Sequence, residues 1–108
     1  ERGIYLATEG PRLETPAEIR FFSNHADVVG MTGVPEVILA REKGICYASI
    51  CVVCNMAAGL QNELTADEIS IIYKKKQPLI SKIIKSAIES FDGKSSCSCK
   101  NVLSKASL

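Results

Sequence analysis

The sequence predicts an α/β fold with a mixed, mostly parallel sheet that carries helices on both faces. Three short apolar runs, at residues 4–7, 27–31 and 45–53, alternate with two segments of helical spacing. Continuous apolar strands that alternate with helices are typical of parallel sheets buried on both sides. Three strands form a poor free-standing sheet, and the sequence opens at Glu1 directly on the first of them. We therefore expect a fragment of a larger domain, with further strands supplied by a longer chain or by another subunit.

The first two helices are marked by local signals at their ends. Thr15 precedes Pro16 and is followed three positions later by Glu18, which is the pattern of a reciprocal capping box at a helix start. The next segment of helical spacing, residues 34–43, stops at Gly44, a residue that favours helix C-termini. These signals predict two short helices between the three strands.

The last part of the sequence divides into a helix and a tail. Thr65 opens a second capping box and a long amphipathic pattern, in which Pro78 is expected to cause a kink or a division into two helices. Beyond this pattern the composition becomes rich in Ser, Lys and Cys. We therefore predict that residues 1–91 are part of one domain and that residues 92–108 are a polar C-terminal tail.

The composition excludes several classes of function. The chain of 108 residues has 13 basic and 12 acidic side chains, so it lacks the basic field of a nucleic-acid binder. Its longest mostly apolar stretch, residues 47–60, is shorter than the roughly 20 residues needed to cross a bilayer, and no signal-peptide pattern is present. We expect a cytoplasmic protein with no nucleic-acid or membrane partner.

Polar groups follow each predicted strand. Residues 10–15 join the first strand to a capped helix, and Thr32 lies just before the next helix start, where an anion is favoured. Asn55 follows the third strand. Because the carboxyl ends of parallel strands meet at one edge of a sheet, we expect these groups on that edge. Two alternatives stay open: residues 10–15 form only a capped turn, and Thr32 is only a cap beside a core Met31.

The cysteines form two groups. Cys46, Cys51 and Cys54 lie on the predicted third strand at offsets that point to opposite faces, so we expect buried thiols there and not a zinc site. Cys97 and Cys99 lie in the tail, where two thiols without a nearby histidine leave a tetrahedral metal shell half empty. No metal is therefore expected, and the single histidine has no partner from which a catalytic relay can be assembled.

Three ordered motifs, at residues 8–18, 26–37 and 44–50, resemble the C-terminal half of the trimeric purine nucleoside phosphorylase and 5'-methylthioadenosine phosphorylase family. The resemblance implies a three-layer sandwich of the phosphorylase type, of which residues 1–91 are the C-terminal half. It also implies a pentosyltransferase that cleaves a purine nucleoside with inorganic phosphate as co-substrate and with no metal or organic cofactor. A homotrimer or a dimer of trimers, completed by the N-terminal half of the parent chain, is the implied assembly.

The resemblance also implies roles for single residues. Met31 matches the methionine that packs on the ribose, and Thr32 matches the hydroxyl that contacts phosphate. Leu13 stands where the family usually has a phenylalanine against the purine, so apolar contact remains without aromatic stacking. Asn55 matches the catalytic residue that hydrogen-bonds the departing base, a role that suits an amide with both a donor and an acceptor. The implied substrate-binding stretch continues through Met56 and Ala57.

The same resemblance bears on the choice of nucleoside. Glu14 and Asn55 match members that prefer 6-oxopurines, whereas Ala66 replaces a histidine near the 5'-hydroxyl and forms an apolar 5' pocket with Ile69. Burial favours a methylthio group in such a pocket over an unpaired hydroxyl. We expect phosphorolysis of 5'-methylthioadenosine to adenine and 5-methylthioribose 1-phosphate. The alternatives are a 6-oxopurine nucleoside phosphorylase, acting on inosine, guanosine or methylthioinosine, and a non-catalytic fragment or assembly module.

The tail adds one further resemblance. Cys97-Ser98-Cys99 is similar to the CxC motif of hyperthermophilic archaeal members of the family, which hold intracellular disulfides. It implies a disulfide or redox role for Cys97 and Cys99. A small thiol-disulfide protein is a different class of function, but it does not account for the three motifs upstream.

Overall fold

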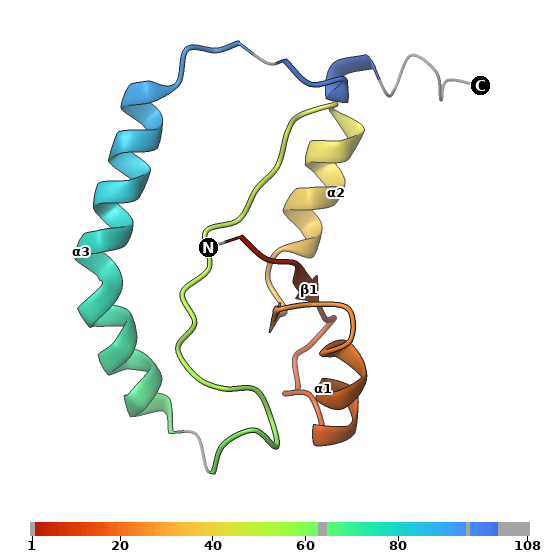
Figure 1. The fold of residues 1–108 in the computed structure, drawn as a ribbon, viewed down its shortest axis with the longest axis vertical. Helices are drawn as coiled ribbons and strands as arrows, with labels where there is room; N and C mark the ends of the chain where they lie inside the picture. Colours follow the sequence, from red (N-terminus) through yellow and green to blue (C-terminus); the bar gives the residue numbers. More distant parts are fainter. Residues whose placement is uncertain (1, 63–64, 95, 102–108) are drawn as a thin grey trace.

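The computed structural model describes residues 2–62, 65–94 and 96–101. Strands and helices alternate in its first half, and one long helix stands apart in its second half (Figure 1). In chain order the elements are β1 (Tyr5–Ala7), α1 (Pro16–Phe22), β2 (Val28–Gly30), α2 (Val34–Glu42), α3 (Ala66–Ser90) and the 3-10 helix η1 (Cys99–Asn101). The predicted α/β class is confirmed.

The sheet consists of β1 and β2, which pair in parallel. Tyr5 is opposite Val28 and Ala7 is opposite Gly30. The pairing continues past β1, since the Thr8 backbone N–H donates to the Gly30 carbonyl at 2.8 Å. Because both strands run in the same direction, the loops that follow them leave from the same edge of the sheet.

The ring of Tyr5 explains the glycines at the end of β2 and in the loop after it. A Cβ at Gly30 would lie 2.6 Å from the Tyr5 Oη, and a Cβ at Gly33 would lie 2.8 Å from the Tyr5 ring. The Tyr5 hydroxyl also accepts a hydrogen bond from the Thr32 backbone N–H at 3.4 Å. A side chain at either glycine would displace this ring from the loop after β2.

Both predicted capping boxes are confirmed. Thr15 and Glu18 cap α1 reciprocally, and Thr65 and Glu68 do the same for α3. The expected division of the last helix at Pro78 does not occur, because α3 runs unbroken for 25 residues. A proline removes one backbone hydrogen bond, and the other turns of a helix this long keep theirs.

The predicted third strand is wrong: residues 45–53 form an irregular connection. A strand exists only through hydrogen bonds to a neighbouring strand, and the described part of the chain pairs only β1 with β2. The expectation of buried thiols fails for the same reason. Cys46 and Cys51 are exposed and Cys54 is half-buried, because no sheet layer within the described residues covers this segment.

The described chain leaves much apolar surface in contact with solvent. Its accessible area is 9245 Å², whereas about 5,900 Å² is typical of a folded monomer of this mass. The radius of gyration is 16.9 Å, against about 13 Å for a compact domain of 100 residues. Among the described hydrophobic residues only Ile19, at 4% exposure, is buried.

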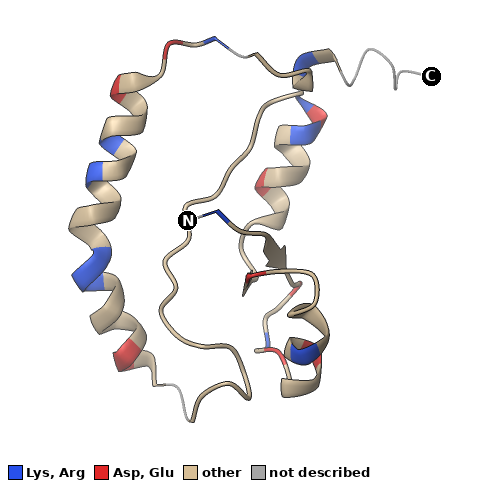
Figure 2. Ribbon diagram, in the orientation of Figure 1, with Lys and Arg blue, Asp and Glu red and all other residues tan. Residues whose placement is uncertain are grey.

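Charge is distributed unevenly over this open arrangement. Figure 2 shows basic residues along α3. Residues 45–62, which lie between α3 and the rest of the molecule, carry no charged side chain of either sign. Within the described residues, no helix has both the length and the apolar character needed to span a bilayer.

We predict that Gly30→Ala destabilises the full-length protein by about 1–3 kcal/mol, the usual cost of adding a methyl group to occupied space. The cost should fall in part in a Tyr5→Phe background, which removes the hydroxyl oxygen 2.6 Å from the added Cβ. Urea denaturation of both single variants and the double variant measures the free energies of unfolding. An equal cost in both backgrounds would show that Tyr5 does not impose the glycine.

Candidate active site

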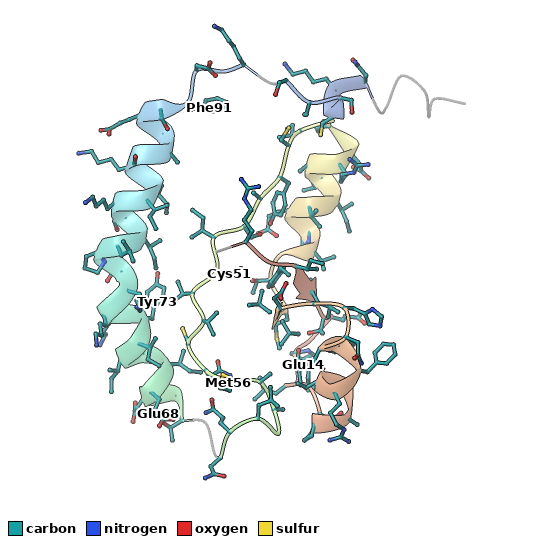
Figure 3. All side chains as sticks on the ribbon, in the orientation of Figure 1. Glu14, Cys51, Met56, Glu68, Tyr73 and Phe91 are labelled. Atoms are coloured by element: carbon teal, nitrogen blue, oxygen red, sulfur yellow. The ribbon has the colours of Figure 1, made fainter. Side chains whose placement is uncertain are left out.

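A cavity of about 980 Å³ opens at the edge of the sheet where the two strand-end loops meet. It lies between these loops and the uncharged segment 45–62, and Tyr73 reaches it from α3 (Figure 3). This volume is at the upper end of the range typical of small-molecule sites. Most of the predicted substrate-binding residues line it, namely Leu13, Glu14, Met31, Thr32, Asn55, Met56 and Ala57.

The two residues of the predicted 5' pocket do not join this group. Ala66 and Ile69 lie in the first turn of α3 and are not among the described residues that line the cavity. Tyr73, one turn further along the helix, is the residue of α3 that does line it. The apolar 5' pocket therefore stays a prediction.

Glu14 is held in place by a residue at the end of β1. The Thr8 hydroxyl donates a hydrogen bond of 2.6 Å to the Glu14 Oε1. Both residues are half-buried, so this bond is shielded from competition with bulk water. The contact leaves the second carboxylate oxygen of Glu14 as an acceptor for a ligand in the cavity.

An ion pair orders the loop that carries Leu13 and Glu14. The Arg12 guanidinium binds both carboxylate oxygens of Glu18, at 2.7 and 2.9 Å, and also donates to the Leu13 carbonyl. The hydrogen bond from Arg12, followed by those from Thr15, lowers the pKa of Glu18 to about 2. The same bond raises the pKa of Arg12. One carboxylate thus caps α1 and ties down the loop before it.

The two strand-end loops contact each other through Met31. Gly10 has a φ of +66°, and a Cβ there would lie 2.9 Å from the Met31 Sδ. Thr32 is exposed, and the N-cap of α2 is Gly33, which makes no side-chain cap hydrogen bond. The alternative that Thr32 serves only as a helix cap is therefore wrong, because its hydroxyl does not cap α2.

Asn55 lies in a turn that packs on the start of α1. Its Nδ2 donates to the Met56 carbonyl at 2.8 Å, and the Met56 N–H donates to the Gln61 Oε1 at 2.6 Å. Gly59, with a φ of +81°, brings this turn so close to Pro16 that a Cβ would lie 2.7 Å from the proline ring. The turn is fixed while one amide N–H and the carbonyl oxygen of Asn55 can still serve a ligand.

The cysteines of the tail meet a third cysteine at the far end of α2. The Sγ atoms of Cys46 and Cys97 are 2.9 Å apart, and both lie within 4.8 Å of the Cys99 Sγ. Hydrogen bonds with Cys97 and Cys46 raise the pKa of Cys99 to about 11. The implied disulfide of Cys97 and Cys99 stays a prediction, because nothing in the described residues shows that bond. Residue 95 and residues 102–108 of the predicted tail lie outside the described residues.

Sequence reasoning missed four residues that the structure brings into these sites. Tyr5 and Thr8 support the loops, Tyr73 lines the cavity, and Cys46 joins the tail cysteines. Thr8 directly follows the apolar run of the first strand, and a polar residue at a strand end could have been predicted to belong to the site. No sequence signal links Cys46 to the tail cysteines, because it is 51 residues away from its partner Cys97.

Comparison with known proteins gives the class of this chain. Residues 1–89 match the family model of the phosphorylase superfamily, so the chain belongs to that superfamily and the resemblance of its motifs is confirmed. It is 52% identical over 99 residues to a probable S-methyl-5'-thioinosine phosphorylase of Methanosarcina acetivorans, covering 91% of this chain and 38% of that protein.

Two further relatives carry other substrate names. A 6-oxopurine nucleoside phosphorylase of Pyrococcus furiosus is 47% identical over 107 residues, with 97% of this chain and 40% of the relative covered. An S-methyl-5'-thioadenosine phosphorylase of Pyrococcus horikoshii is 42% identical over 103 residues, with 95% and 40% covered. The chain spans about two fifths of the length of these relatives.

We predict that Arg12→Gln raises the pKa of Glu18 from about 2 toward its ordinary value of 4.5, because the largest cause of the shift is removed. A lowered carboxyl pKa stabilises the folded state above pH 4.5, and this contribution disappears as the pH falls toward 2. Carboxyl-carbon NMR titration of the full-length protein measures the shift. Arg20→Gln, on the same helix as Glu18, is the matched control and should leave the pKa of Glu18 unchanged. A pKa that stays near 2 without Arg12 would contradict the prediction.

Proposed function

We propose that the protein containing this chain is a purine nucleoside phosphorylase that cleaves the glycosidic bond with inorganic phosphate. The products are a free purine base and a pentose 1-phosphate. The observation that carries the proposal is the cavity at the sheet edge, where Glu14, Met31, Thr32 and Asn55 come together from three separate loops. Membership of the phosphorylase superfamily supports the same reaction class.

The chemistry requires positioning and charge stabilisation. A transition state with oxocarbenium character puts positive charge on the sugar and negative charge on the departing base. In the proposed site, phosphate binds at the Thr32 hydroxyl, next to the N-terminus of α2, whose dipole favours an anion. Met31 packs against the ribose and Asn55 hydrogen-bonds the base as it leaves. No metal or organic cofactor takes part in this proposal.

The base is proposed to be a 6-oxopurine. A 6-oxopurine carries a hydrogen on N1, which an ionised Glu14 accepts, whereas N1 of adenine is itself an acceptor and is repelled by a carboxylate. The Thr8 hydrogen bond fixes Glu14 at the cavity wall and supports this role. Asn55, which lines the same cavity, donates its remaining amide N–H to O6 or N7.

The sugar is proposed to carry a 5'-methylthio group. The motif resemblance puts Ala66 and Ile69 beside the 5' position, although neither is among the described residues that line the cavity. Their side chains offer no hydrogen-bond partner to a 5'-hydroxyl, and a buried hydroxyl without a partner costs about 1–3 kcal/mol. Combined with the 6-oxopurine base, this gives S-methyl-5'-thioinosine as the preferred substrate. The name of the Methanosarcina acetivorans relative agrees with this choice. 5'-Methylthioadenosine is the second candidate, favoured by the name of the Pyrococcus horikoshii relative.

The exposed apolar surface supports a larger assembly. Residues 45–62 and the amphipathic face of α3 have no covering layer in the described residues, and Ile88 and Phe91 are 70% and 75% exposed. The relatives are more than twice as long as the matched part. We propose that the other half of the phosphorylase domain covers these faces and that the protein assembles as a trimer or a dimer of trimers.

We predict that the full-length protein releases hypoxanthine from S-methyl-5'-thioinosine faster than it releases bases from 5'-methylthioadenosine, inosine or adenosine. Base release should require phosphate, and chromatography of the four reactions with and without phosphate measures it. Faster release of adenine from 5'-methylthioadenosine would overturn the proposed base. Release from none of the four would overturn the proposed reaction and leave the superfamily membership intact.

We predict that Glu14→Gln lowers kcat/KM for S-methyl-5'-thioinosine by roughly 10- to 150-fold, the range expected for loss of a hydrogen bond to a charged acceptor. The rate on 5'-methylthioadenosine should stay the same or rise, because the repulsion of adenine N1 is relieved. Glu9→Gln is the matched control, since Glu9 is an exposed carboxylate of the same loop that is not among the residues lining the cavity. An equal loss on both nucleosides would remove Glu14 from base recognition.

A further inference from the structure

We propose that Cys46, Cys97 and Cys99 form a binding site for one soft, thiolate-seeking metal ion of the zinc or copper(I) class. The three Sγ atoms lie within 4.8 Å of one another, although they come from two segments far apart in the chain. This site is separate from the cavity of the proposed phosphorylase, which none of the three cysteines lines. Cys46 supplies the third ligand that a CxC pair alone lacks.

The sulfur positions fit a metal with small adjustments. Thiolates 2.3 Å from a zinc ion are about 3.8–4.0 Å apart in tetrahedral or trigonal geometry. Cys46 and Cys97 are now 2.9 Å apart and would separate by about 1 Å. Both side chains are exposed, so rotation about their χ1 angles can provide this movement without displacing the backbone.

The backbone around the cluster is already arranged. Gly44, buried with a φ of +63°, lies so close to the tail that a Cβ would be 2.9 Å from the Cys99 carbonyl oxygen. Cys99 begins η1, and this close approach to Gly44 brings it beside the end of α2. The Cys99 backbone N–H donates to the Cys97 Sγ at 3.4 Å, a hydrogen bond that stabilises a thiolate. The ligands are thus brought together before any metal binds.

Charge favours a cation at this point. Each thiol that binds the metal loses its proton to solvent and donates a sulfur lone pair, so a divalent ion with three thiolates has a net charge of −1. Without a cation, three neighbouring thiolates repel one another. Lys43 and Lys100 adjoin Gly44 and Cys99 in sequence and offset the remaining charge. Zinc would complete its shell with a solvent oxygen.

The test uses the full-length protein, fully reduced, with Co²⁺ as an optical probe and Zn²⁺ as competitor. We expect one Co²⁺ per chain to give a sulfur-to-cobalt charge-transfer band that Zn²⁺ abolishes. Cys46→Ser, Cys97→Ser and Cys99→Ser should each weaken Zn²⁺ binding by about 100-fold or more, measured by competition with a chelator. Cys51→Ser and Cys54→Ser are the matched controls and should keep the affinity within a few-fold.

Three results would overturn the proposal. The first is the absence of a charge-transfer band in the reduced protein with Co²⁺. The second is an unchanged Zn²⁺ affinity in Cys46→Ser. The third is a loss of Zn²⁺ affinity in the Cys51→Ser and Cys54→Ser controls equal to that in the cluster variants. If Cys46 and Cys97 form a disulfide under air and the reduced protein binds no metal, the first of these results is obtained and the proposal is overturned. Because the readout is metal affinity, a failure here is distinct from a failure of the proposed phosphorolysis.

Discussion

Three residues of β1 pair in parallel with three residues of β2, and the candidate active site depends on this register. With Ala7 opposite Gly30, the loop at residues 8–15 and the loop at residues 31–33 leave the sheet side by side. Tyr5 then holds the second loop through its contacts with Gly30 and Gly33 and its hydrogen bond with the Thr32 N–H. A slip of one residue would turn Tyr5 to the other face and separate the two loops.

The hydrogen bonds that support the site join residues close together in the sequence, whereas these nearby residues do not close the cavity off from solvent. Thr8 holds Glu14, Arg12 holds Glu18, and the turn after Asn55 closes on itself through Gln61. Each of these contacts spans six residues or fewer. Yet Leu13 is 69% exposed and Met56 is 56% exposed, so the cavity is only partly enclosed by these residues. A purine bound there needs further apolar cover to be dehydrated, and the open apolar surface offers a place for it.

The distance over which each signal acts decides what the sequence could predict. The capping boxes at Thr15 and Thr65 act within three residues, and both were predicted correctly. The strand predicted at residues 45–53 is absent from the structure. Its apolar pattern indicates a tendency to be buried, whereas a strand also needs a neighbouring strand to pair with. The loops of the site were predicted from their place after the strands, but the support of Glu14 by Thr8 depends on where two side chains point. No sequence pattern pairs Cys46 with Cys97.

α2 links the two sites and limits how one can act on the other. Its N-terminus follows Thr32, where phosphate is proposed to bind, and its C-terminus leads to Gly44 and the cysteine cluster. The nine residues of the helix span about 14 Å, whereas a metal contacts its ligands within about 2.3 Å. A metal at the cysteines therefore cannot touch the reacting groups. Within the described residues α2 joins the two sites, so we expect an effect on phosphorolysis to act through the position of α2, which the cluster would anchor at the end opposite to the proposed phosphate site.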